Sequence, residues 1–427
     1  MTRKRTIVLV VLAVLVLLAL ALAWIAQPNR FAGLVVGRIG SALGLEITAS
    51  GISEYRLRGT PMLVLRDVVA REPGAAAPLL RAKRIHVSLP WSTLRGGGSD
   101  LTARRIELDA PQLDLPALQH WLAARPPSEK RMPTLTDGLR IVDGTIVNND
   151  WRIDRIHADL PSLHPDRPMR SRLRGRYLDP PLTIPVDLVV AISLPEALIK
   201  AGVTGFATRG RIAIERGSDW RLPATVALSG PLRIGDDHLQ VTPARLGMAA
   251  TYEAGETRVP FALGLSGPLR FDEATWTLAP AGAALRGRGE PADDPVPTLD
   301  AHGTLALGHR LALQLDGVIG QWPEAWPALP PPIGQSRSPL PFALRYDGRA
   351  DFADVAALQL RRDATRFDGR FRLPAVLDWL DTAATGSPLP PLAGTLVTPK
   401  LEISGATLEG VEIEFAGDDD ASPVSSP

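Results

Sequence analysis

The sequence predicts a mainly β protein that begins with a transmembrane helix and contains a few short helices. The chain of 427 residues holds 38 Gly and 40 Pro, spread along its length in the manner of short strands between turns. Several segments alternate apolar and polar residues, which is typical of antiparallel strands with one wet face. One stretch near the N-terminus is apolar and uncharged over the length that a membrane-spanning helix needs.

That stretch covers residues 7–25, which contain no charge, proline or glycine. Basic residues 3–5 precede it and only Arg30 follows closely, so the N-terminus is expected in the cytoplasm and the rest of the chain outside it. A cleavable signal peptide is the alternative, because residues 21–23 have the A-x-A form. The apolar core is longer than the roughly 7 to 15 residues of a signal peptide. We therefore expect residues 1–27 to form a basic cytoplasmic end and a retained anchor.

Composition excludes several classes of function. Lys plus Arg number 47 and Asp plus Glu 46, so no overall field attracts nucleic acid. The absence of cysteine excludes disulfides, thiolate metal sites and cysteine nucleophiles. Hydrophobic residues make up 45% of the chain, which indicates apolar surface beyond that needed for a core.

Residues 28–45 predict a short amphipathic helix that Pro28 opens and Gly44 ends. Its apolar stripe suits either the membrane surface or the end of a β structure, where it would cover a sheet edge. Its polar face carries only Arg30 and Arg38, so we favour the second interpretation.

From Leu45 onward the pattern predicts strands. Residues 63–71 form one of them, and its alternation breaks at Asp67, which indicates a bulge. Residues 115–125 predict a short helix, and residues 126–137 have the composition of a linker. In the strands before the helix, His86 and Glu107 lie opposite the apolar side. The apolar side itself carries Ile47, Ile85, Val87, Ile106 and Leu108.

The order of these elements resembles the N-terminal module of the AsmA family of envelope proteins, over about the first 115 residues. The resemblance rests on the basic end and span, Pro28-Asn29-Arg30-Phe31, a strand ending in Gly51, Leu80-Arg81-Ala82, a corner with Leu94, and the strand 103–115 with Pro111. The closing phrase 394–415 is also similar to the end of such proteins. The resemblance implies an inner-membrane anchor and a periplasmic sheet, elongated and curled into a β-groove. It also implies kinship with bridge-like lipid transfer proteins and a role in outer-membrane biogenesis and phospholipid traffic.

The remaining chain predicts a repeated β-hairpin body over residues 138–326, with turns at Asp-Gly pairs such as Asp143-Gly144, Asp316-Gly317, Asp347-Gly348 and Asp368-Gly369. Residues 228–234 return as residues 265–271, thirty-seven positions later, which is typical of a stacked β structure. A proline-rich break at 327–340 precedes a C-terminal β region at 341–417, which includes a helix near 374–384. The acidic tail 418–427 is expected to be disordered.

No constellation for covalent chemistry stands out. The sequence contains neither H-E-x-x-H nor a Walker A loop, and residues 287–292 fit a G-x-G-x-x-A pattern with no following helix. The pairs His157 with His164 and His302 with His309 share a seven-residue spacing, which places the two members of each pair on opposite faces of one strand, and no carboxylate lies at a matching offset. We therefore predict no enzyme activity, no catalytic residue, no metal site and no cofactor.

The sequence and the resemblance together lead to one functional hypothesis. The bulk of the chain lies in the periplasm on a single inner-membrane span and shields or transfers phospholipid or another envelope lipid. Other envelope proteins are further possible partners. The candidate groove residues are Ile47, Ile85, Val87, Ile106 and Leu108. The alternative is an assembly scaffold whose apolar face is filled by its own side chains, and an extracytoplasmic hydrolase ranks third.

Overall fold

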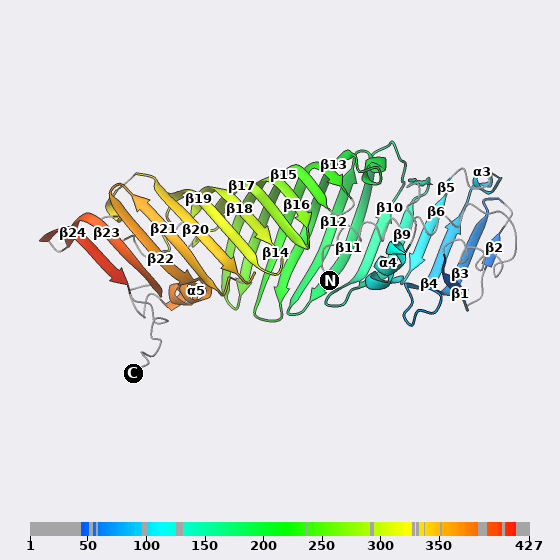
Figure 1. Ribbon diagram of the computed structural model, residues 1–427, viewed down its shortest axis with the longest axis horizontal. Coiled ribbons are helices and arrows are strands. Elements are labelled where there is room, and N and C mark those ends of the chain that lie inside the picture. Colours follow the sequence, from blue (N-terminus) through cyan, green and yellow to red (C-terminus); the bar gives the residue numbers. More distant parts are fainter. Residues whose placement is uncertain are drawn as a thin grey trace. The chain divides into compact units, whose positions relative to one another are not determined.

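The computed structural model describes most of the chain after residue 43 (Figure 1). The predicted anchor (1–27) and the acidic tail (418–427) lie outside the described residues, as does nearly all of the predicted helix 28–45. No helix among the described residues is long and apolar enough to cross a membrane. The described residues are 44–50, 54–56, 59–95, 101–124, 131–235, 238–290, 294–326, 329, 333–336, 338–350, 352–382, 391–403 and 406–415.

The chain divides into two compact units. Unit 1 contains the described residues up to 242 together with 252–257, and unit 2 contains 243–251 and the residues from 258 onward. The helices of unit 1 are α3 (Trp91–Arg95), α4 (Leu115–Ala123) and η2 (Pro195–Leu198). Its strands are β1 (Glu46–Ala49), β2 (Glu54–Arg56), β3 (Met62–Arg71), β4 (Leu80–Ser88), β5 (Thr102–Ala103), β6 (Arg105–Asp109), β7 (Gln112–Asp114), β8 (Thr134–Leu135), β9 (Leu139–Val147), β10 (Arg152–Leu160), β11 (Met169–Asp179), β12 (Leu182–Ile192), β13 (Val203–Arg216) and β14 (Trp220–Ile234).

Strand β15 (Leu239–Ala254) contributes residues to both units, and β16 (Thr257–Asp272) lies almost entirely in unit 2. The helices of unit 2 are η3 (Ile333–Gln335) and α5 (Leu373–Thr382). Its further strands are β17 (Thr275–Gly287), β18 (Thr298–Leu307), β19 (Leu311–Gln321), β20 (Leu340–Gly348), β21 (Val355–Arg362), β22 (Thr365–Arg372), β23 (Leu392–Ile403) and β24 (Ala406–Phe415).

The mainly β, antiparallel fold with few helices is confirmed. From β9 to β14, and again from β16 to β24, each strand pairs antiparallel with the next one along the chain. Among the described strands, parallel pairings join β9 to β6 and β7, and β5 to β8. The predicted helices near 115–125 and 374–384 are α4 and α5. Residues 134–135, which composition assigns to a linker, form β8, and Leu135 is buried.

A row of left-handed residues crosses the first half of unit 1. Asp67, Ala110, Asp143 and Arg155 have φ between 44° and 56° and lie at matching positions on β3, at the β6–β7 junction, on β9 and on β10. The bulge predicted at Asp67 is therefore confirmed. Asp143 is part of the same row inside β9, so the hairpin turn predicted at Asp143-Gly144 is wrong.

This row reverses which side chains face the core. On β6 and β7 the buried residues are Ile106 and Leu108 before Ala110, and Leu113 after it. On β9 they are Leu139 and Ile141 before Asp143, and Ile146 after it. A left-handed residue shifts the alternation by one position, as a bulge does. Both stretches of each strand can therefore direct large apolar residues into one core.

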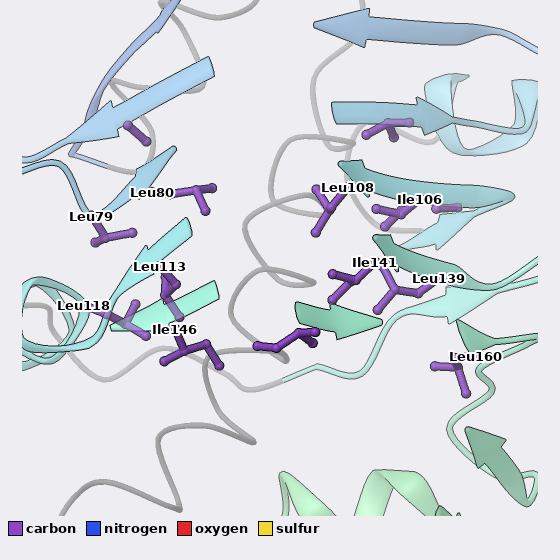
Figure 2. Packing of buried hydrophobic residues seen from close by; sticks show 14 of the residues in the cluster. Leu79, Leu80, Ile106, Leu108, Leu113, Leu118, Leu139, Ile141, Ile146 and Leu160 are labelled. Carbon is purple, nitrogen blue, oxygen red and sulfur yellow. The ribbon is translucent and has the colours of Figure 1, made fainter. Parts of the chain in front are cut away.

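Helix α4 belongs to that core. The Asp114 side chain caps it by accepting a hydrogen bond from the Ala117 amide at 2.9 Å, and Pro116 occupies the first turn, where its missing N–H costs nothing. Its buried side chains are Leu115, Leu118 and Trp121. Figure 2 shows Leu118 close to Leu113 and Ile146, while Ile106 and Leu108 lie by Leu139 and Ile141.

The core of unit 2 follows the register of its strands. Phe342 pairs with Leu360, which pairs with Phe367, which in turn pairs with Leu396. Ile333, on η3, and Leu340 are almost fully buried against this row. The turns predicted at Asp316-Gly317 and Asp368-Gly369 are wrong, because these pairs lie inside β19 and β22.

Candidate functional site

The structure brings the five predicted groove residues together on one side of β1, β4 and β6. Ile85 pairs with Leu108, and Val87 pairs with Ile106. Val87, Ile106 and Leu108 are only 2%, 1% and 3% exposed, respectively, and belong to the core that includes α4. Ile47 and Ile85 are partly buried and pack against the same core. At this end of unit 1 the apolar side is packed.

The opposite side of β4 and β6 carries a cluster of ion pairs. Arg84 donates hydrogen bonds to Asp109 at 2.6 Å and to Glu107 at 2.8 Å, and Arg105 donates to Glu107 at 2.6 Å. Burial alone would raise the pKa of Glu107, but the hydrogen bonds from Arg84 and Arg105 outweigh it and lower the pKa to about 2. Glu107 is therefore a fixed anion at neutral pH.

His86 lies in this cluster, and the sequence analysis placed it on a wet face. Its side chain is only 16% exposed, Nδ1 lies 3.6 Å from a Glu107 oxygen, and neither ring nitrogen has a hydrogen-bond partner among the described residues. Burial lowers the pKa of His86, and the negative charge of Glu107 only partly opposes this effect. The side that alternation predicts to be wet is therefore half-buried here.

A second apolar surface lies further along unit 1, and we call it the β11–β14 apolar face. Its rows are set by register: Leu173 pairs with Leu188, Leu188 with Gly210, and Gly210 with Val226. Every apolar side chain of this face is at least partly buried, but most of them are not fully buried in a core. The face consists of Leu173, Tyr177, Ile184, Val186, Leu188, Val190, Ile192, Phe206, Ile212, Ile214, Leu222, Ala224, Val226 and Leu228.

The reverse of the same strands is charged. Arg172 donates two hydrogen bonds to Asp187, at 3.1 and 3.0 Å, and Arg174 donates a third at 3.2 Å. Arg176 donates two hydrogen bonds to Asp154, at 2.9 and 2.7 Å. Since neighbours along a strand point to opposite faces, β11 to β14 form a sheet with one apolar side and one ionic side.

Few described elements cover the β11–β14 apolar face. Helix η2 packs at one end of β13 and β14, and its buried residues are Pro195, Ala197 and Leu198. No other described helix of unit 1 makes comparable contact with β11 to β14. Burial on this face therefore stays partial, in contrast to the packed side of β4 and β6.

Two glycines on this face sit in different surroundings. A Cβ atom at Gly210 would clash with the Asp187 carbonyl oxygen of the neighbouring strand. A Cβ atom at Gly175 would make ordinary contacts of 3.5 Å or more. Only Gly210 is therefore required for close approach of two backbones, and such approach is a usual role of glycine inside strands.

The histidine pairs of the sequence analysis do not share strands. His157 is on β10 and His164 follows it in a loop; His302 is on β18 and His309 lies in the next turn. The opposite-face interpretation of their spacing is therefore wrong. Among the residues that the structure describes, no group of three His, Asp or Glu could hold a metal ion.

Comparison of the chain with family models, with curated proteins and with solved structures gives no match. Its function must be argued from its own residues. The residues predicted from the sequence lie only on the N-terminal strands, and none of them is on the β11–β14 apolar face. A signal was present, because Arg170, Arg172, Arg174 and Arg176 alternate along β11 and mark the ionic side.

Proposed function

We propose that this chain is an inner-membrane-anchored periplasmic protein of outer-membrane biogenesis that shields or transfers phospholipid along an apolar sheet face. The resemblance of its first 115 residues to the AsmA module supports this assignment. The observation that carries it is the β11–β14 apolar face, which is continuous in register, only partly buried, and backed by an ionic side. No covalent chemistry is required.

The energetics of acyl chains favour such a surface. Each methylene group that leaves water contributes about 0.8 kcal/mol, so a tail laid along several strands binds without specific polar contacts. The ionic reverse side, with Arg172, Arg174 and Asp187, keeps the other face of the sheet in water. The site in this proposal is thus the β11–β14 apolar face and not the packed strands with Val87 and Leu108.

The alternative is a scaffold whose apolar surface is covered by its own side chains. One observation favours it: Val87, Ile106 and Leu108 are closed off in a core. Lipid bound to the isolated protein separates the two proposals, because a self-filled scaffold has no space for it. Native mass spectrometry of the full chain, purified in mild detergent, measures that lipid directly.

Two adjacent valines on β12 provide a matched pair of variants. Val190 lies on the apolar face between Ser171 and Thr208, whereas Val189 lies on the ionic side between Arg172 and Arg209. Val190→Asp places a carboxylate where tails would lie and should reduce bound lipid by about tenfold or more, equivalent to about 1.4 kcal/mol. Val189→Asp gains two arginine neighbours and should bind lipid at the wild-type level.

Circular dichroism and thermal melting must first show that both variants fold. A folded Val190→Asp protein that carries as much lipid as Val189→Asp would contradict the proposed site. Wild-type protein that carries no lipid, and takes up none from labelled phospholipid, would favour the scaffold.

A further inference from the structure

Two pairs of Trp and Tyr side chains mark one edge of the β11–β14 apolar face. Trp151 and Tyr177 have ring centroids 5.6 Å apart, and Trp220 and Tyr252 have ring centroids 6.1 Å apart. All four residues belong to unit 1 and all are half-buried. We call them the aromatic edge.

Topology places these pairs at the same edge. In an antiparallel series, alternate connections lie at the same end of the strands. Trp151 ends the connection between β9 and β10, Tyr177 is near the end of β11, and Trp220 starts β14 after the turn from β13. The two pairs flank β12 and β13, which span about 15 Å between β11 and β14 at the usual strand spacing.

The opposite edge has a different composition. Its connections are residues 161–168, 193–202 and 235–238, and none of them contains Trp or Tyr. The residues that end strands of this face there include Met169 and Ile192, which are purely apolar in their side chains. The apolar face is therefore asymmetric between its two edges.

Ion pairs accompany both aromatic pairs. Tyr177 donates its hydroxyl hydrogen to Asp179 at 3.0 Å, and Arg176, next to it in sequence, is held by Asp154. Beside Trp220 and Tyr252, Arg221 forms an ion pair with Glu253. Since neighbours along a strand point to opposite faces, the two arginine ion pairs lie on the ionic reverse of the sheet. Asp179, two positions from Tyr177, provides a polar group on the side of the apolar face.

We infer that the aromatic edge holds the polar headgroup end of a phospholipid whose tails lie on the β11–β14 apolar face. This inference rests on the proposed function. Trp and Tyr are enriched where one part of a side chain is apolar and the other is wet, which is the environment at the headgroup level of a lipid.

A flat contact of this edge with a membrane surface is a different use of the same residues. The four side chains are half-buried and contact one another in pairs. That arrangement favours contact with a single lipid bound on the sheet face over contact with a membrane surface.

Tryptophan quenching by spin-labelled phosphatidylcholine tests the inference on the full chain. The label is placed on the headgroup in one sample and deep in the acyl chain in the other. Native mass spectrometry confirms equal lipid loading, and gel filtration removes vesicles. The emission of Trp151 and Trp220 is the difference between wild type and the double variant Trp151→Phe with Trp220→Phe, which keeps the aromatic bulk.

We expect the headgroup label to quench this difference signal at least about twofold more than the deep label, because about five residues of strand, or roughly 15 Å, separate the edge from the middle of the face. Equal or stronger quenching by the deep label, at equal loading, would overturn the inference and leave the proposed function standing. Quenching that appears only with vesicles present would also overturn it, in favour of a membrane belt. Absence of any bound lipid would remove the proposed function itself.

Discussion

The two halves of unit 1 have the same alternation of apolar and polar residues, but the apolar side is packed into a core in one half and stays half-buried in the other. In the first half, between β3 and β9, apolar residues from both sides of the row of left-handed residues enter one core together with α4. In the second half, from β11 to β14, alternation continues without such a row among the described strands, and the apolar side stays half-buried. The difference shows that a sheet face becomes core or accessible surface through what covers it, because the sequence pattern within the strands is similar.

The ionic sides differ as well. Arg84 in the first half is 28% exposed, whereas Arg172, Arg174 and Arg211 in the second half are 53%, 53% and 79% exposed. Removing a buried ionic partner leaves an uncompensated charge, which is costly, while exposed ion pairs contribute little. The first half should therefore dominate the stability of unit 1.

The largest expected effect is that of a charge in the packed half. Val87 lies between Leu63 and Ile106 and is 2% exposed. Val87→Asp should destabilise unit 1 by about 4 kcal/mol or more, against about 1 kcal/mol for the partly buried Val190→Asp. Chemical denaturation followed by circular dichroism measures both. Equal losses would mean that the two halves are packed alike.

A smaller effect should appear in acid. The folded-state pKa of Glu107 is lowered to about 2 from an ordinary value of 4.5, so its contribution to stability is complete above pH 4.5 and is lost as the pH falls toward 2. The full shift corresponds to about 3 kcal/mol at most. Glu107→Gln should be less stable at neutral pH and should lose less stability in acid. A variant with the same acid profile as wild type would show that another group controls it.

The smallest of the three effects concerns the two glycines of the β11–β14 apolar face. Gly210→Ala forces the new Cβ against the Asp187 carbonyl and should cost about 2 kcal/mol, because the backbones of β12 and β13 must separate. Gly175→Ala, on the same face, serves as the control and should change stability by less than about 0.5 kcal/mol. Thermal melting distinguishes them. Similar shifts for both would mean that β12 and β13 separate at little cost.

The strands and the short helices could be predicted from the sequence, because alternation and helical spacing are local signals. The prediction failed at Asp143-Gly144, and the reason is physical. An Asp-Gly pair signals positive φ, and both a hairpin turn and a bulge inside a strand need positive φ. Only the register of β9 against β10 distinguishes the two.

The β11–β14 apolar face was not predicted, and the residues that were predicted as a groove lie in the packed half of unit 1. The face shared by Ile85, Val87, Ile106 and Leu108 follows from period two, and the structure confirms that these residues lie together. Whether that face is covered depends on α4 and on the left-handed row, which are contacts between distant segments. The ion pairs of Arg84 with Glu107 and Asp109 could not be predicted from the sequence either, because the partners are separated by 23 and 25 positions.

The consecutive antiparallel pairing from β16 to β24 bears on how such a chain can change in length during evolution. Each strand there contacts mainly the strands just before and after it, so loss or duplication of two neighbouring strands leaves the direction and the facing of all others unchanged. Loss of a single strand would reverse every later one. The length of the sheet can thus vary in steps of one hairpin, and the 37-residue echo between β14 and β16 has the spacing of such a step.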